Sequence, residues 1–338
     1  MARGERVIGA SSLAFDPARP RYAEWARLPY YDAPDFSVQL SELVHGMGIT
    51  RIHTPHPVVH AHLQAILPRL LPSCMLDGEA PYAADLAAYR RTLRAAAALA
   101  DAGDGLGGAT PRASALGREA AAALLRQIQA VPGMCDDEKL WALAAIARHA
   151  PPGDLVEIGS WWGKSAVALA WLGARHGIGP LLCVDPWSAE GMRQAREDLD
   201  AVSAAADHEE AALIFRINLL SLGVPGVNYL RMPSVQGAAH YRADPVARSE
   251  AFGETRYAGA ISVLHIDGNH EYSFVSADVA EWLPMLRDGG WLVLDDYLWP
   301  FGNGPRRVGD ALLRERAADV LCAFTAGSAL FLRLRQSQ

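Results

Sequence analysis

Four polar residues in the C-terminal part of the chain have the types and spacing of a reactive site. Asp267 and His270 stand three residues apart in HIDGNHEY, after one apolar run, and Asp295 and Asp296 follow the next apolar run in WLVLDDY. Three carboxylates form a hard oxygen site suited to magnesium, manganese or calcium. Histidine has a proton affinity suited to general-base catalysis near neutral pH. The structural alternative is that Asp295 and Asp296 cap the following segment and that His270 bonds a backbone carbonyl.

A second candidate site is the glycine-rich stretch VEIGSWWGKSA, which begins at Val156. Its GSWWGKS is one residue shorter than the phosphate-binding loop G-x-x-x-x-G-K-[ST], because three residues rather than four separate Gly159 from Gly163. That spacing is too short to wrap the backbone amides around a phosphate. The dinucleotide fingerprint G-x-G-x-x-G fails as well, since Trp161 stands two residues after Gly159. A magnesium-dependent ATPase or kinase that uses this stretch with Asp295 stays open as an alternative.

The elements that must position these residues follow from the pattern that begins near residue 153. Seven short apolar runs alternate with helical segments, which predicts an α/β fold with a mostly parallel sheet covered on both faces. Only the turn TAGS separates the last two runs, so we expect a C-terminal antiparallel hairpin. Ligands bind such sheets at the carboxyl ends of the strands, where the acids, the histidine and the glycine loop would converge. The runs are DLVEIG, LLCVD, VNYLRM, ISVLHID, WLVLDD, VLCAF and ALFLRLR, and the intervening helices are expected near 166–176, 189–206, 208–222, 235–242, 273–287 and 307–318.

The N-terminal part of the chain has a different pattern. It is irregular to about residue 75 except for helical periodicity near VVHAHLQAILPRLLP, and three helices are expected after it. We therefore predict an accessory, mainly helical segment over 1–132 and a catalytic domain over 133–338. The three helices are expected at 83–102, at 114–130 with Ser114 as N-cap, and at 136–149 with Asp136 or Asp137 as N-cap.

Four histidines lie close together in RIHTPHPVVHAH, and His56 and His60 have the spacing of two metal ligands on one helical face. Pro57 disfavours a helix at His56, and no cysteine or carboxylate completes a ligand set nearby. A role on the surface or in a substrate pocket is therefore expected for His53, His56, His60 and His62.

Composition limits the classes of partner. The 338 residues carry a formal net charge of −7, which gives no general electrostatic reason to bind DNA or RNA. No run of about 18 to 20 apolar residues could span a membrane, and the first residues lack the apolar block of a signal peptide. The four scattered cysteines suit a reducing compartment. We expect a cytoplasmic protein without nucleic-acid or membrane partners that forms a homo-oligomer.

The glycine stretch resembles motif I of the class I S-adenosylmethionine-dependent methyltransferases, written E-x-G-x-x-x-G-x-S, and the likeness extends from about residue 136 to the C-terminus. Asp185 ends the next predicted strand and would accept hydrogen bonds from both ribose hydroxyls. Its structural alternative is an acid at a helix N-terminus before Pro186. The resemblance implies a Rossmann-like, seven-stranded sheet and S-adenosylmethionine as cofactor. It implies as cofactor-binding residues Glu157, Gly159, Ser160, Gly163, Ser165, Asp185, Ser234 and Asp267.

The acid and histidine constellation resembles the metal-dependent O-methyltransferases. The catechol type has lysine as base and an Asp-Asn pair. The histidine and the Asp-Asp pair of this sequence are more similar to the sugar O-methyltransferases of the macrocin and mycinamicin type. A phenolic acceptor is therefore less expected. The resemblance implies Asp267, Asp295 and Asp296 as ligands of a divalent metal, expected to be magnesium. It implies His270 as the base for a hydroxyl on a small molecule, such as a sugar of a secondary metabolite. A non-catalytic cofactor-binding module is a third alternative, but it would have no need of these four residues.

Other features allow two interpretations each. Residues 244–259 interrupt the alternation of strands and helices and are expected to form a surface insertion, a lid or a subunit contact. Two sets of aromatic residues could contact ligands or belong to the core. They are Trp161, Trp162 and Trp187 around the glycine loop, and Tyr297, Trp299 and Phe301 after the acid pair.

Overall fold

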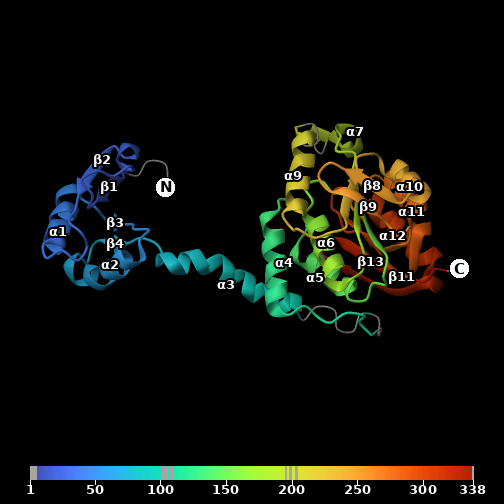
Figure 1. Cartoon of the computed structure of the whole chain (residues 1–338), viewed down its shortest axis with the longest axis horizontal. Coiled ribbons are helices and arrows are strands. Elements are labelled where there is room, and N and C mark those ends of the chain that lie inside the picture. Colours follow the sequence, from blue (N-terminus) through green and yellow to red (C-terminus); the bar gives the residue numbers. More distant parts are fainter. Residues whose placement is uncertain are drawn as a thin grey trace. The chain divides into compact units, whose positions relative to one another are not determined.

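The computed structural model describes residues 6–100, 106, 110–194, 196–197, 200–201 and 205–336, and Figure 1 shows the chain. The chain divides into two compact units, Met1–Arg91 and Thr92–Gln338. Helix α4 (Arg118–Ala130) packs against α6 (Lys164–His176) inside the second unit, because its leucine and isoleucine side chains join the core of the sheet. The start of the catalytic domain at residue 133 stays a prediction.

The described residues of the first unit include helices α1 and α2, the first half of α3 and two small parallel strand pairs. The helix expected near residues 58–72 is confirmed as α2 (Pro57–Leu70), but α1 (Phe36–Met47) was not predicted. The strands are only two to four residues long, too short for a period of two to stand out in the sequence. They are β1 (Ile8–Ser11) with β2 (Glu24–Arg27), and β3 (Arg51–Ile52) with β4 (Met75–Leu76).

The N-terminal histidines have structural contacts. His56 is the N-cap of α2 and its ring accepts the backbone N–H of Val59, which suits a helix with proline at its first position. His60 is buried on the same helix, and the ring of His62 meets Phe36 edge-on at 5.6 Å. Among the described residues, every group able to hold a metal lies in the second unit.

Helices α3 (Pro81–Ala100), α4 and α5 (Asp137–Ala147) lie in the chain between β4 and the first strand of the large sheet. The prediction of Ser114 as an N-cap is wrong, because α4 begins at Arg118 after Gly117. The backbone before it is held instead by the carbonyl of Arg148, which accepts N–H groups from residues 112 and 113. Asp136 is confirmed as the N-cap of α5, and its carboxylate accepts the backbone N–H of Lys139 at 2.7 Å.

All seven predicted strands form one sheet with the order β12-β13-β11-β10-β5-β6-β7. Strand β13 runs antiparallel to both of its neighbours, which confirms the terminal hairpin, and the pairs from β11 to β7 are parallel. The strands are β5 (Asp154–Ile158), β6 (Leu181–Val184), β7 (Val227–Leu230), β10 (Ile261–Ile266), β11 (Leu286–Leu294), β12 (Val320–Ala326) and β13 (Ala329–Leu334).

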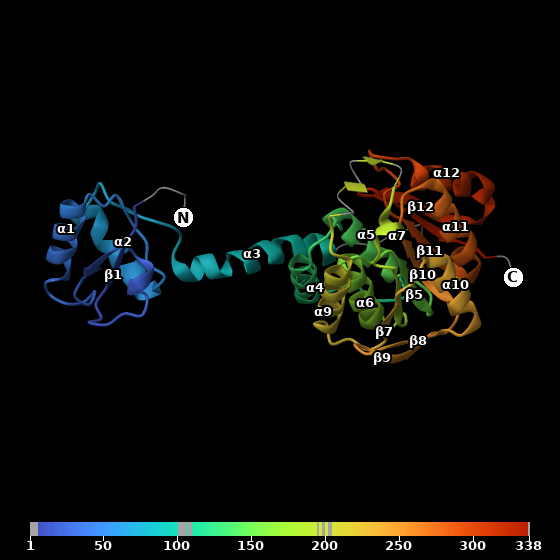
Figure 2. The ribbon, with the colours of Figure 1, turned by 90° about the horizontal axis from the view of Figure 1, so that it is seen from above.

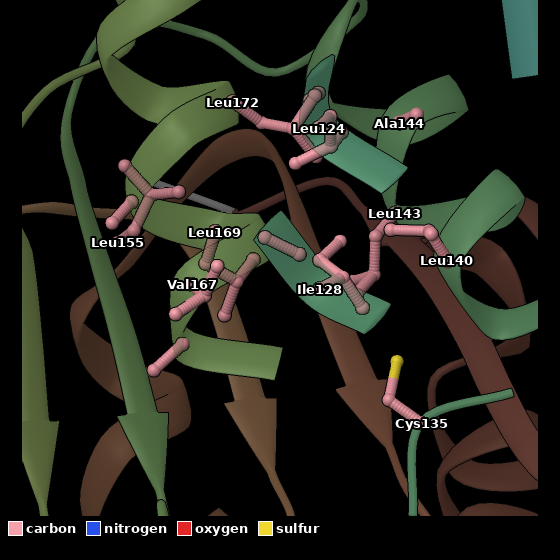
Figure 3. Close-up of a cluster of buried hydrophobic side chains, with 14 of the residues drawn as sticks. Leu124, Ile128, Cys135, Leu140, Leu143, Ala144, Leu155, Val167, Leu169 and Leu172 are labelled. Atoms are coloured by element: carbon pink, nitrogen blue, oxygen red, sulfur yellow. The ribbon is translucent and has the colours of Figure 1, made fainter. Parts of the chain in front are cut away.

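Alternate strand residues face two separate cores, as the period of two in a strand requires. Leu155 packs into the core formed with α4, α5, α6 and α9, part of which is shown in Figure 3, whereas Val156 packs into the core formed with α10, α11 and α12. Figure 2 shows the two groups of helices on opposite sides of the strands. The remaining bounds are α9 (His208–Leu220), α10 (Ser234–Ala243), α11 (Tyr272–Trp282) and α12 (Gly304–Glu315).

Two predicted segments differ in detail. The helix expected at 189–206 is interrupted: α7 (Ala189–Met192) ends before residues 193 and 194, helical residues follow at 197 and 200–201, and part of the range lies outside the described residues. The insertion at 244–259 forms an antiparallel pair, β8 (Val246–Ser249) with β9 (Gly253–Arg256). The buried side chain of Asn228 on β7 donates hydrogen bonds to two of its carbonyls at 3.0 Å, so the insertion is attached to the sheet edge.

None of the described helices combines the length and the apolar character that a membrane crossing would need.

Candidate active site

The glycine loop lies between β5 and α6 and touches the acid segment directly. Gly159 has φ +79° and Gly163 has φ +88°, both in the left-handed region that favours glycine. A Cβ atom on Gly159 would overlap the backbone carbonyl of Asp267. The ends of β5 and β10 therefore meet at a distance that only glycine permits.

Lys164, the lysine of the Gly-Lys-Ser sequence, is neither free in solvent nor a cap of its helix. Its ammonium group donates to the carbonyl of Gly133 at 3.0 Å, in the segment that precedes α5. A phosphate-binding loop would need this lysine to bind the phosphate, but its ammonium group already has a partner in the protein.

Asp185 fixes the glycine loop to the end of β6. One carboxylate oxygen accepts the backbone N–H groups of Ser160 and Trp161 at 2.9 Å, and the other accepts that of Trp187 at 2.7 Å. Burial raises the pKa of Asp185, and these three N–H groups act against that rise. A carboxylate has about four acceptor positions, so about one is left for a ligand.

Glu157 lies beneath the loop with a completely buried side chain. Ser160 donates its hydroxyl to one oxygen at 2.7 Å, and Nδ1 of His265 lies 3.0 Å from the other. The Glu157 carboxylate therefore positions Ser160 of the glycine loop and His265 of β10, and it has no contact with solvent.

Three of the described residues other than glycine have a left-handed backbone, and all lie at the carboxyl edge of the sheet. They are Trp161 at φ +46°, Trp187 at φ +41° and Asp296 at φ +53°. For bulky tryptophans this conformation is unusual and costs of the order of 1–3 kcal/mol each, and such strain gathers at functional sites. The sequence carried no signal for it.

The acids form two groups that share Asp267, and the inner group is buried around Lys139. The Lys139 ammonium contacts Oδ2 of Asp295 and lies 3.3 Å from Oδ2 of Asp267. The side chains of Lys139 and Asp295 are 2% and 4% exposed, and that of Asp267 is 23% exposed. Nε2 of His265 lies 3.9 Å from both carboxylates. These are therefore closely coupled charges.

The pKa directions of the inner group follow from burial and charge together. Burial acts to lower the pKa of Lys139, but Asp267 and Asp295 hold it well above its ordinary value. Burial acts to raise the pKa of Asp295, but the Lys139 ammonium holds it below its ordinary range. Burial and the charge of Asp295 raise the pKa of Asp267 well above its ordinary value. An ammonium–carboxylate pair, Lys139 with Asp295, therefore persists at neutral pH.

The outer group consists of Asp267, His270 and Asp296, all partly exposed. Nε2 of His270 lies 3.0 Å from Oδ2 of Asp296, and Nδ1 lies 3.4 Å from the side-chain nitrogen of Gln194. The ring of Trp299 meets that of His270 edge-on with centroids 4.4 Å apart. The group therefore combines an oriented imidazole with two carboxyl groups.

The predicted ligand set Asp267, Asp295 and Asp296 is divided between these groups. Asp295 uses one oxygen for Lys139, and its other oxygen accepts the backbone N–H of Asp296 at 2.9 Å and the hydroxyl of Ser328 at 3.3 Å. The oxygens of Asp267 and Asp296 approach His270 within the outer group. Asp295 and Asp296, which are adjacent in the chain, therefore belong to the inner and the outer group respectively.

The two other serines expected to bind the cofactor have internal positions. Ser165 is buried in the first turn of α6. Ser234 begins α10, where its oxygen accepts the indole N–H of Trp282 at 2.9 Å and its hydroxyl bonds Asp278 on α11. Ser234 therefore joins the start of α10 to α11.

Replacement of Asp278 by asparagine should change the pH dependence of stability. Burial raises the pKa of Asp278 to about 6 against the hydrogen bond from Ser234. The native carboxyl binds its proton more tightly than the unfolded one, so its contribution is complete below about pH 4 and is lost as the pH rises through about 6. The loss is about 3 kcal/mol. Urea unfolding should show D278N to be the more stable protein at pH 7.5, with a smaller advantage at pH 5.

The exposed Asp244, changed to asparagine, is the matched control and should leave the pH dependence unaltered. A stability difference between D278N and the unchanged protein that is the same at both pH values would contradict the assignment.

The aromatic residues divide between core and site. Trp187 is buried and packs on Phe215 with ring centroids 4.9 Å apart, so it belongs to the core. Its indole N–H donates to the carbonyl of Trp161 at 2.8 Å. The hydroxyl of Tyr297 donates to Asp310 at 2.6 Å, whereas Trp299 lies on His270.

Two site residues were missed by sequence reasoning. Lys139 stands in the first turn of a predicted helix and His265 stands in a predicted strand. The available signals were a lysine three residues after the N-cap and a histidine inside the otherwise apolar run ISVLHI. Neither signal shows which way the side chain points.

Comparison with known proteins finds one matching family model and several distantly similar solved structures. Residues 156–297 match a family model described as a methyltransferase domain, and no curated protein matches the sequence significantly. Solved structures that align include the O-methyltransferase NovP, at 17% identity over 74% of this chain and 100% of that one with a TM-score of 0.41. Another is CalS11, a TDP-rhamnose 3'-O-methyltransferase of calicheamicin biosynthesis, at 13% identity over 89% and 95% of the two chains with a TM-score of 0.34.

A third is the MycE methyltransferase of the mycinamycin pathway, in complex with Mg, SAH and mycinamycin VI. It aligns at 14% identity over 55% of this chain and 45% of that one, with a TM-score of 0.33. These likenesses are too distant to carry an argument about reaction or substrate. Residues 156–297 are therefore similar to a methyltransferase domain, and they cover the strands from β5 to β11 of the seven-stranded sheet.

Proposed function

We propose that this protein is an S-adenosylmethionine-dependent O-methyltransferase that acts on a hydroxyl group of a small molecule. The observation that carries the proposal is the direct approach of the glycine loop to the acid segment, where Gly159 lies against the carbonyl of Asp267. A cofactor held by that loop would therefore lie beside the acids and His270. Proximity and alignment are the main contributions that such a transfer needs from the protein.

The loop residues fit the cofactor. Asp185 keeps about one acceptor position, which supports a hydrogen bond to one ribose hydroxyl rather than the two expected from the sequence. S-adenosylmethionine would supply a methyl group on a sulfonium sulfur, a good leaving group that becomes a neutral thioether as the oxygen–carbon bond forms. The backbone of the loop, left-handed at Gly159 and Gly163, would bind and orient it.

His270 would accept the proton of the acceptor hydroxyl. As the donor to Asp296, Nε2 carries the hydrogen of the ring, and Nδ1 keeps a lone pair. A carboxylate that orients an imidazole and stabilises its charged form is a common arrangement for a general base. Gln194, at 3.4 Å from Nδ1, would be displaced by the incoming hydroxyl.

The residues of the outer group also fit a divalent cation such as magnesium. Asp267 and Asp296 would hold it, because magnesium is usually bound by one or two carboxylates and keeps several waters. Asp295, expected as a third ligand, is already occupied by Lys139, Ser328 and the backbone of Asp296. When bound, the cation would lower the pKa of a hydroxyl and fix its position. A vicinal diol, as in a sugar, has the geometry to use such a site.

Calorimetric titration with S-adenosylhomocysteine and with ATP, each with and without magnesium, tests the proposal against the ATPase or kinase alternative. We expect binding of S-adenosylhomocysteine without a need for magnesium, and no response to ATP. The variant K164A should bind S-adenosylhomocysteine unchanged, because Lys164 is bonded to Gly133. Tight ATP binding that K164A abolishes, with no response to S-adenosylhomocysteine, would overturn the proposal.

A further inference from the structure

The inner acid group already contains a cation that belongs to the protein. Its residues are His265, Asp267 and Asp295, and the ammonium of Lys139 lies between the two carboxylates. Lys139 is 2% exposed, so water cannot replace the contacts it makes. A buried charge of this kind persists only with partners that neutralise it.

Both the backbone and the side chain of Lys139 are held by other residues. Its backbone N–H is held by the N-cap Asp136 at 2.7 Å, and its side chain ends on the carboxylates that follow β10 and β11. The helix start is itself attached to the β12–β13 turn, where the N–H of Gly327 donates to Glu138 at 3.1 Å. The first turn of α5 therefore places the ammonium group beside the two acids.

Nε2 of His265 faces the carboxylates of Asp267 and Asp295. Its side chain is completely buried, Nδ1 lies 3.0 Å from Glu157, and Nε2 lies 3.9 Å from Asp267 and from Asp295. Within the described part of the chain, Nε2 has no hydrogen-bond partner. A histidine held by a carboxylate at one nitrogen and open at the other is the usual arrangement of a metal ligand.

We propose that Lys139 is a positioning residue whose ammonium serves as the resident cation of the inner group, where it occupies a place that His265, Asp267 and Asp295 would otherwise offer to a divalent ion. Lys139 holds Asp267 beside Asp295 and confines any divalent ion to the outer group. Removal of its charge converts the inner group into a His-Asp-Asp metal site. The inference concerns ion binding alone, so its test needs no methyl transfer and is independent of the proposed function.

The test is the variant K139M, which keeps an unbranched side chain one heavy atom shorter and removes the charge. We expect its Tm to fall by roughly 10 °C, because the buried Asp295 and the neighbouring, partly exposed Asp267 lose their cation. Co²⁺ should restore the Tm, and calorimetry should show one more bound Co²⁺ than in the unchanged protein. The new ion should give a visible absorption band, since a nitrogen ligand in an enclosed site strengthens the d–d transitions of Co²⁺.

Matched variants separate the two groups. K139R keeps a cation and should gain no additional ion. In the K139M background, H265Q should abolish the new absorption band, whereas H270Q in the outer group should leave it. The proposal is overturned if K139M binds no more Co²⁺ than the unchanged protein, or if the band survives H265Q.

A failure of K139M to fold would also be informative. The double variant K139M/D295N removes both members of the charged pair and should regain a Tm close to that of the unchanged protein without metal. If the double variant is as unstable as K139M, Lys139 acts through packing and not as a cation, and the proposal is wrong.

Discussion

Alanine in place of His270 is expected to lower the rate constant for methyl transfer by about 10²–10⁴-fold, the usual contribution of a positioned general base. The imidazole is 15% exposed and oriented by Asp296 at 3.0 Å, so it is both reachable and fixed. A neutral hydroxyl has a pKa far above the working pH, and without His270 its proton would pass to water. Single-turnover rates with saturating S-adenosylmethionine measure the step directly.

The affinity for S-adenosylhomocysteine should be unchanged in H270A, because His270 has no contact with the glycine loop in the proposed arrangement. D296N is a companion variant: asparagine tolerates the left-handed backbone at φ +53°, so the change removes charge without adding strain. It should give an intermediate loss. H240A is the control, since His240 on α10 bonds the backbone carbonyl of Val246 on β8. Undiminished transfer by H270A would show that another group accepts the proton.

The sheet could be predicted because its strands are short apolar runs with a clear alternation of helices between them. The convergence of Asp267, His270, Asp295 and Asp296 followed from one rule, that parallel strands end at the same edge. The structure brings these four residues together as expected. What a linear pattern could not give is how neighbouring residues divide the site: Asp295 faces Lys139, and Asp296 faces His270 because its backbone is left-handed.

Lys139 and His265 could not be identified from the sequence for related reasons. All six residues of β10 are buried, so its alternation does not distinguish the histidine that faces the acids from its apolar neighbours. Lys139 reaches the cluster only because α5 packs with its N-terminus at the carboxyl edge, which is a property of the tertiary arrangement. Asp185 shows the same limit, since its three backbone partners come from two loops.

Alanine at Gly159 is expected to be the most damaging small substitution in the glycine loop. Two costs add: about 1–2 kcal/mol for alanine at φ +79°, and about 1–3 kcal/mol for a methyl group forced against the carbonyl of Asp267. Relief of the overlap must move the glycine loop away from the acid segment. We therefore expect a loss of about 3 kcal/mol in the free energy of unfolding and a weakening of S-adenosylhomocysteine binding by more than tenfold.

Gly177 provides the matched control for this prediction. It has φ +62° at the C-terminal end of α6, and a Cβ there would meet no atom within 4 Å. G177A therefore carries the backbone cost alone and should lose about 1 kcal/mol, with cofactor affinity unchanged. Urea unfolding and calorimetric titration of both variants isolate the contact between Gly159 and Asp267. Equal losses in the two variants would mean that this contact adds nothing, and the coupling of the glycine loop to the acid cluster on which the proposed function depends would then be wrong.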